Sequence, residues 1–141
     1  MAFVKLDHIG VAVKNIDEAL ELFTKKLGLK PPKKGILNFP ELKFKNAMLP
    51  IGDSYVELLE SSDPESDIGR FMERQGEGIF HMCIEVDDIE DEIKSLKERG
   101  VGVFEAPPTA STPYKRGFIR RKDAKGVLIE LVPQERKKAW E

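Results

Sequence analysis

The chain has 141 residues, of which 40% are hydrophobic and 34% are charged, so it is long enough to bury one core. The 23 basic and 25 acidic side chains are interspersed and leave a net charge of −2, which argues against nucleic acid or an anionic membrane as partner. A single cysteine, Cys83, excludes an intramolecular disulfide and favours a cytoplasmic location, and no apolar run reaches the roughly 18 residues that span a bilayer.

The first part of the chain predicts a β-α-β-β-β succession. Residues 3–14 alternate apolar and polar in part, which is typical of a strand. The following segment has apolar residues at helical spacing and predicts a helix that stops at Gly28. Residues 29–42 are rich in Pro, Lys and Gly and predict a loop or an edge segment. Two strands are then expected at about 43–50 and 54–60.

A second succession of the same kind follows. It is predicted to contain a helix that ends at Gly100 and strands at 79–86, 101–104, 117–121 and 126–132. We expect one domain over residues 1–141, composed of a first module at about 3–60, a linker helix at about 61–76, a second module at about 77–133 and a charged tail at 134–141. The predicted fold class is α+β, with two βαβββ modules that complete one curved, mostly antiparallel sheet around a cavity.

The two modules repeat each other at a shift of 73 positions, which carries His8 onto His81, the only two histidines of the chain. The same shift carries Glu57 onto Glu130, so each histidine is followed 49 positions later by a glutamate in an apolar run. Side chains alternate across a strand, and each glutamate should therefore point away from its apolar neighbours and into the cavity. The repeat indicates a duplicated half-site of one imidazole and one carboxylate.

Two imidazoles and two carboxylates are a ligand set for a divalent metal ion. Each residue taken alone is more often structural than a ligand, but the shared shift favours a joint role. We predict that His8, Glu57, His81 and Glu130 hold one ion per chain, and this set suits Co, Ni, Zn, Mn or Fe without selecting among them. Four ligands would close a structural zinc site, whereas an octahedral metal would keep two positions for water or substrate oxygens.

The paired modules resemble the vicinal-oxygen-chelate superfamily, which includes glyoxalases, bleomycin-resistance proteins and dioxygenases. The resemblance extends over about residues 5–133 and rests on residues 6–13, 52–60, 64–71, 76–81, 85–89 and 126–131. The blocks at 64–71 and 76–81 are most similar to methylmalonyl-CoA epimerases. This likeness implies the same four metal ligands, a metal such as cobalt, and a homodimer.

The resemblance also implies an isomerase that epimerises methylmalonyl-CoA or a similar 2-acyl thioester. The metal would stabilise an enediolate formed when the α-proton leaves, and Glu57 and Glu130 are the predicted catalytic bases. The family's Gly-Ala-His-Gly loop is replaced here by residues 110–117. We expect basic residues around this loop to bind the phosphates of coenzyme A, or otherwise to be solvated; they are Lys115, Arg116, Arg120 and Arg121.

Other functions fit the same pattern. An isomerase of the lactoylglutathione lyase (glyoxalase I) type would use the same metal and glutamate pair on a hemithioacetal. A non-catalytic module that binds a small molecule or an antibiotic would use only the cavity, and such proteins often lack the metal residues that this chain keeps. An iron-dependent dioxygenase normally uses two histidines and one carboxylate, so a fourth protein ligand argues against it.

Overall fold

The structure, a computed structural model, describes residues 3–141. Their contacts divide them into two compact units. The first unit comprises His8–Phe80 with Trp140–Glu141, and the second unit comprises His81–Ala139 with the described residues that precede His8. Each unit thus contains most of one predicted module, and the strand that begins the chain is divided between them.

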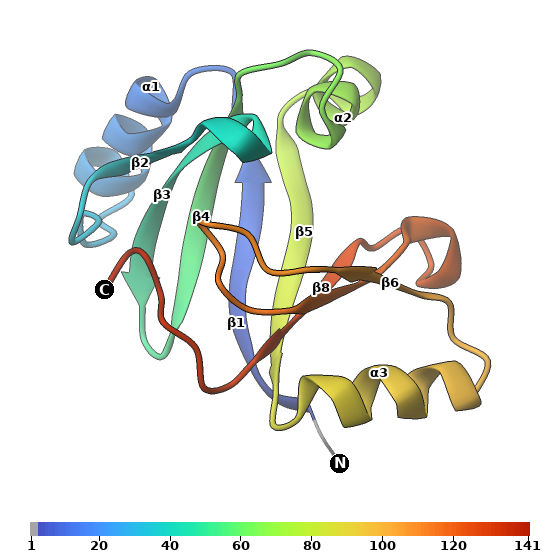
Figure 1. Cartoon of the computed structure of the whole chain (residues 1–141). Helices are drawn as coiled ribbons and strands as arrows, with labels where there is room; N and C mark the ends of the chain where they lie inside the picture. Colours follow the sequence, from blue (N-terminus) through green and yellow to red (C-terminus); the bar gives the residue numbers. More distant parts are fainter. Residues whose placement is uncertain (1–2) are drawn as a thin grey trace. The chain divides into compact units, whose positions relative to one another are not determined.

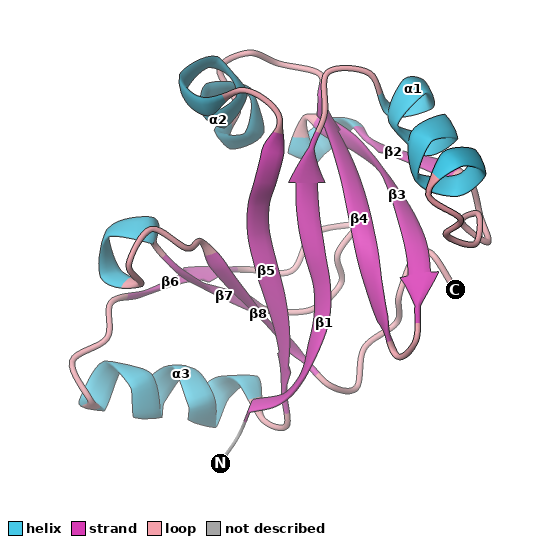
Figure 2. Ribbon diagram, turned by 180° about the vertical axis from the view of Figure 1, so that it is seen from behind, coloured by secondary structure: helices cyan, strands magenta, loops and turns pink. Residues whose placement is uncertain are grey.

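The first unit is built on a four-stranded arrangement with α1 on one face (Figure 1). Its elements are the second half of β1 (Phe3–Ala12), α1 (Ile16–Glu21) with a π-helical turn (Leu22–Lys26), β2 (Ile36–Phe39), a 3-10 turn (Pro40–Leu42), β3 (Phe44–Ile51), β4 (Ser54–Ser61) and α2 (Asp67–Gln75). Strands β2, β3 and β4 pair antiparallel, whereas β1 pairs parallel with β4 (Figure 2). The edge strand β2 lies in the segment predicted as a loop or an edge.

Local sequence explains why α1 begins where it does and which face it buries. The side chain of Asn15 accepts a hydrogen bond from the Glu18 backbone N–H, which satisfies a donor left open at the helix start. Ile16 is fully buried among Leu49 and Leu58 of the adjacent strands. Burial of such apolar side chains supplies most of the stability of a short helix.

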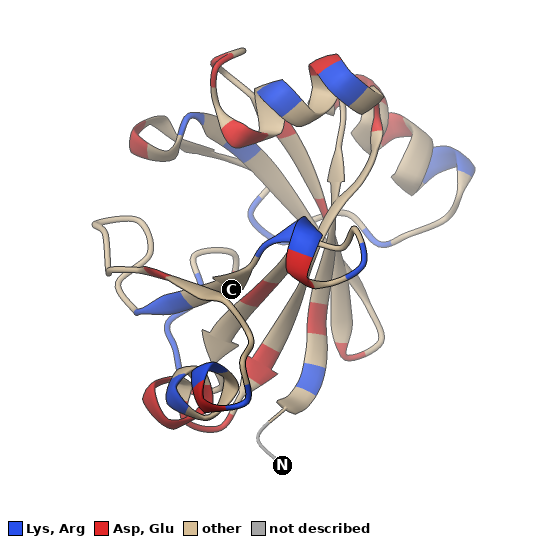
Figure 3. Ribbon diagram, turned by 90° about the vertical axis from the view of Figure 1, so that its right-hand side faces the viewer, with Lys and Arg blue, Asp and Glu red and all other residues tan. Residues whose placement is uncertain are grey.

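The second unit repeats this plan. Its elements are most of β5 (Gly78–Val86), α3 (Ile89–Glu98), β6 (Val103–Ala106), β7 (Arg116–Ile119), a 3-10 turn (Arg121–Asp123) and β8 (Ile129–Pro133). Strand β5 pairs parallel with β8, and β6, β7 and β8 pair antiparallel. Asp88 caps α3 by accepting from the Asp91 N–H, and Leu96 of this helix packs in a core with Val86 and Leu131. Lys and Arg are interleaved with Asp and Glu around α3 (Figure 3).

The predicted α+β class is confirmed, with the strand order β2-β3-β4-β1-β5-β8-β7-β6. Two strands begin later than predicted. Strand β6 starts at Val103 because Val101 still donates to the Leu96 carbonyl at the end of α3. Strand β8 starts at Ile129, since Gly126 has a φ of +94° and closes the preceding turn. None of the helices within residues 3–141 is long and apolar enough to cross a membrane.

Candidate metal centre

The first predicted pair, His8 and Glu57, comes together on the parallel strands β1 and β4. Nε2 of His8 lies 3.1 Å from Oε1 of Glu57, and both residues are buried. Glu57 of β4 pairs with Gly10 of β1, and His8 lies two residues before Gly10 on the same strand. Side chains two positions apart share a face of the sheet, which is why the imidazole and the carboxylate meet.

A third side chain, Asn46 of β3, completes this half-site. Its Nδ2 donates a hydrogen bond of 2.7 Å to Oε2 of Glu57, so the two carboxylate oxygens have different partners. Asn46 is 3% exposed, and its Oδ1 has no hydrogen-bond partner among residues 3–141. Sequence analysis missed Asn46, although an amide within the apolar part of a strand was an available signal.

The second predicted pair, His81 and Glu130, has the same geometry within its own unit. Nε2 of His81 lies 3.2 Å from Oε1 of Glu130, and both residues are buried. Glu130 faces Cys83 across the parallel β5–β8 pairing, so the histidine again precedes the facing residue by two positions. The sequence repeat is therefore also a repeat of side-chain geometry.

Arg116 of β7 holds the remaining oxygen of Glu130. Its Nη1 donates to Oε2 over 3.2 Å, its side chain is 15% exposed, and its guanidinium lies 5.3 Å from the Phe118 ring centroid. Arg116 lies two residues before Phe118, which pairs with Glu130. Asn46 likewise lies two residues before Met48, which pairs with Glu57, so the two side chains occupy equivalent positions. One carboxylate is thus held by a neutral amide and the other by a cation.

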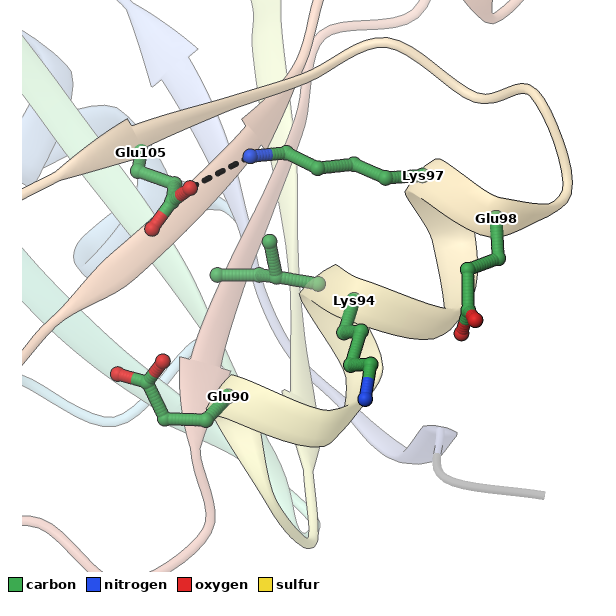
Figure 4. A pocket seen from close by; sticks show the side chains of 6 residues that line it. Glu90, Lys94, Lys97, Glu98 and Glu105 are labelled. Carbon is green, nitrogen blue, oxygen red and sulfur yellow. Dashed lines mark hydrogen bonds and ion pairs between the residues drawn. The ribbon is translucent and has the colours of Figure 1, made fainter.

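Lys115 is placed elsewhere, in a cluster of ion pairs between α3 and β6. Its ammonium pairs with Glu105 and Glu90, and these contacts raise the pKa of Lys115. Hydrogen bonds from Lys115 and Lys97 lower the pKa of Glu105 to about 2. Figure 4 shows Lys97 reaching Glu105 beside a surface pocket that is also lined by Lys94 and Glu98.

The other two predicted phosphate-binding residues follow the end of β7. The Arg120 guanidinium carbon lies 5.6 Å from the Phe104 ring centroid, and Arg121 Nη1 donates to the Gly126 carbonyl over 3.4 Å. The structure therefore separates the four basic residues by environment. Arg116 contacts the predicted metal ligand Glu130, and Lys115 forms ion pairs beside α3. Arg120 and Arg121 lie at the start of the 3-10 turn that follows β7.

The donor atoms in each half-site fit a divalent metal ion. Bonds of about 2.1 Å at right angles place two ligand atoms about 3.0 Å apart, close to the His–Glu separations of 3.1 and 3.2 Å. An N–H···O hydrogen bond gives a similar spacing, so the distances alone suit either arrangement. His8, His81 and Glu130 each offer an atom able to ligate an ion, and imidazole with carboxylate suits Zn, Co, Ni, Mn or Fe.

Known proteins share both sequence and fold with this chain. Residues 7–118 match the family model of the Glyoxalase/Bleomycin resistance protein/Dioxygenase superfamily. The mitochondrial methylmalonyl-CoA epimerase of Dictyostelium discoideum is 29% identical over 129 residues, which cover 90% of this chain and 76% of that protein. A hypothetical protein from Bacillus halodurans is 37% identical, with a TM-score of 0.83 and coverage of 94% and 96%. A Streptomyces coelicolor methylmalonyl-CoA epimerase variant, in complex with 2-nitronate-propionyl-CoA, is 27% identical, with a TM-score of 0.85 and coverage of 98% and 99%.

Proposed function

The chain belongs to the glyoxalase/bleomycin resistance protein/dioxygenase superfamily, and we propose that it is a metal-dependent epimerase within it. Its substrate in this proposal is methylmalonyl-CoA or a similar 2-acyl thioester, whose α-proton it removes and returns to the opposite face. The observation that carries the proposal is the buried His–Glu pair, repeated with one geometry in both units. Epimerases among the relatives and the solved structures supply the substrate class.

The proposed metal site takes its ligands from both repeats. His8, Glu57, His81 and Glu130 would hold one divalent ion per chain, with the metal left open among Co, Ni, Zn, Mn and Fe. A bound ion would act as a Lewis acid that stabilises negative charge on the substrate oxygens as the α-proton leaves. Asn46 and Arg116 fix the orientation of the two carboxylates, because each donates to the oxygen that does not face the histidine.

Proton transfer is assigned to the two glutamates. Exchange between the two faces of a carbon requires a base on each face, and the duplication provides two carboxylates in equivalent settings. Both histidines are used as ligands in this proposal, so no imidazole remains as a base. Glu57 contacts a neutral amide while Glu130 contacts a guanidinium, so the two carboxylates have unequal surroundings.

Binding of the coenzyme A carrier is assigned to the basic residues around β7. Lys115, Arg116, Arg120 and Arg121 all stay candidates for its phosphates, and Lys115 and Arg116 also pair with carboxylates. Arg120→Ala combined with Arg121→Ala should raise KM for a CoA thioester and leave a short pantetheine thioester unaffected. An equal loss for both thioesters would remove these residues from carrier binding.

The test of the proposed reaction is deuterium exchange. Protein stripped of metal and reloaded with Co²⁺ is incubated with methylmalonyl-CoA in D₂O, and label at the α-carbon is followed by mass spectrometry. Glu57→Gln and Glu130→Gln should lose exchange, because an amide can ligate a metal but cannot accept the proton. The surface variant Glu98→Gln is the matched control, since Glu98 is exposed on α3.

Metal content is measured on the same preparations. His8→Ala and His81→Ala should each lose the ion. Stoichiometric metal in the variant that carries both substitutions would contradict the assignment of these histidines as ligands. Turnover of a glutathione hemithioacetal without exchange on CoA thioesters would favour a glyoxalase-type isomerase. Binding of small molecules without turnover of either substrate would favour the non-catalytic module.

A further inference from the structure

The last residues of the chain show a period of two in their burial. Arg136, Lys138 and Trp140 are partly or largely covered, whereas the residue on either side of each is exposed. The tail at 134–141 therefore presents an arginine, a lysine and a tryptophan to the rest of the chain.

Arg136 anchors the tail on two buried carboxylates of the second unit. Its Nη1 donates to Oε2 of Glu85 over 2.8 Å, and its Nη2 lies 3.0 Å from Oδ1 of Asp7. The side chains of Arg136, Asp7 and Glu85 are 1%, 0% and 5% exposed. Burial opposes the charge on Arg136, but the two carboxylates outweigh burial and raise the pKa of the guanidinium.

Lys138 balances the charge of this cluster. Its Nζ lies 3.5 Å from Oε2 of Glu85 and 3.9 Å from Oδ1 of Asp7, so two cations accompany two anions. A buried ion is tolerated when it is paired, and removal of one partner is strongly unfavourable. The tail is thus fixed to β1 and β5 by charged contacts that are almost completely shielded from water.

Trp140 lies against two aromatic rings of the first unit. Its ring centroid lies 6.4 Å from that of the His8 imidazole at an interplanar angle of 81°, and 5.9 Å from that of the Tyr55 ring at 74°. These are edge-to-face arrangements within the range in which aromatic rings attract each other. One side of the His8 imidazole is therefore bounded by the indole.

Asp7 and His8 are consecutive on β1, and the tail contacts both: Arg136 binds Asp7, and Trp140 packs against His8. We propose that the C-terminal tail is a positioning element of the candidate metal centre. Trp140 sets the orientation of the His8 imidazole, and Arg136 holds the strand segment that carries it. The inference relies on the proposed function only for the role of His8 as a metal ligand.

The tail lies outside the duplication, which makes this role specific to the first half-site. The shift of 73 positions carries 134–141 onto 61–68, where Ser61-Ser62-Asp63-Pro64 has no likeness to Gln134-Glu135-Arg136-Lys137. The repeat contains two equivalent histidine–glutamate pairs, and residues 134–141 have no counterpart in it. The two half-sites therefore differ in how their histidines are supported.

Zinc affinity of the metal-free protein, measured by calorimetry, tests the proposal. Trp140→Ala should weaken Zn²⁺ binding about 10-fold, the lower end of what loss of a residue supporting a metal ligand costs. Trp140→Phe keeps an aromatic edge beside His8 and should restore most of the affinity. Gln134→Ala changes an exposed, uncharged side chain of the same tail and is the matched control.

A second readout separates positioning from general stability. Trp140 is the only tryptophan, so its emission reports one place in the structure. Ni²⁺, whose d shell is open, should quench this emission as it fills the site, whereas Zn²⁺ should leave most of it. A purely structural role of Trp140 would lower the melting temperature of the metal-free Trp140→Ala variant and leave its Zn²⁺ affinity unchanged.

The outcomes distinguish the two proposals. An unchanged Zn²⁺ affinity in Trp140→Ala, or Ni²⁺ binding without quenching, would overturn the role of the tail and leave the metal site in place. Lack of deuterium exchange on methylmalonyl-CoA, with intact metal binding and quenching, would overturn the substrate and leave the role of the tail in place. Absence of any metal binding by the wild-type protein would overturn both.

Discussion

Gly69, in the first turn of α2, is expected to be intolerant of even one added carbon. A Cβ at this position would lie 2.4 Å from the Asp63 carbonyl oxygen and 2.7 Å from the backbone carbons of Pro64. These are backbone atoms of a tight turn, so no side-chain rotation relieves the overlap. Helix propensity alone predicts the opposite result, because alanine is favoured over glycine by about 1 kcal/mol inside a helix.

The size of the effect follows from what the Asp63 carbonyl does. It accepts hydrogen bonds from the Ser66 N–H at 3.0 Å, the Ser66 hydroxyl at 2.7 Å and the Ser61 hydroxyl at 2.6 Å. Moving from 2.4 Å to an ordinary contact of 3.4 Å requires a displacement of about 1 Å, which would break or weaken all three. Overpacking costs about 1–3 kcal/mol and each weakened hydrogen bond about 1 kcal/mol. After subtraction of the propensity gain, Gly69→Ala should lower the free energy of unfolding by about 3–5 kcal/mol.

Urea unfolding followed by circular dichroism measures this difference. With a slope of about 2 kcal/mol per molar urea, the midpoint should fall by about 1.5–2.5 M. Gly102→Ala is the matched control, because its Cβ would meet only the flexible Asp123 carboxylate, at 3.2 Å. A Gly69→Ala variant as stable as the wild type would refute the steric reasoning, because the gain in helix propensity would then offset any overlap with the turn.

Lys115→Gln should raise the pKa of Glu105 from about 2 towards its ordinary 4.5, because Lys115 is the first cause of the lowering, and an NMR titration of the Glu105 side chain checks it. Since the folded-state pKa is depressed, these ion pairs stabilise the fold above about pH 4.5 and their contribution is lost as the pH falls towards 2, so the stabilities of the wild type and the variant should converge in acid. Asn46→Ala should lower the free energy of unfolding by about 1.5–3 kcal/mol, because the buried Glu57 carboxylate loses a charge-assisted hydrogen bond. Asn38→Ala, on the exposed side of β2, should leave the urea midpoint unchanged, and equal effects at both positions would contradict this role of Asn46.

The two histidine–glutamate pairs of the candidate site could be predicted because the duplication repeats them at one constant shift of 73 positions. His8 and Glu57 are separated by 49 positions, as are His81 and Glu130, and the structure brings each pair together. Asn46 and Arg116 are equally matched in space, but they are 70 positions apart instead of 73 and differ in residue type. A comparison at fixed shift therefore could not find them.

The ion-pair partners of the tail could not be predicted from the sequence, for a different reason. Arginine and lysine near a chain end are usually solvated, and nothing local marks Asp7 and Glu85 as the partners of Arg136, because those residues lie far away in the sequence. The single-domain organisation, the use of cobalt, the homodimer and the cytoplasmic location stay predictions. The four metal ligands also stay a proposal, supported by the geometry within each unit.

The parallel pairings of β1 with β4 and of β5 with β8 have a consequence for the order of folding. The β3–β4 hairpin closes through a turn at Gly52 and should form within about 1–10 μs, as local hairpins do. His8 reaches Glu57 only after a chain segment of nearly fifty residues has been closed, which is slower and entropically more costly. The same holds for His81 and Glu130. We therefore expect each histidine–glutamate pair to be among the last contacts of its module to form, so that an ion bound by these residues would select chains that have finished folding.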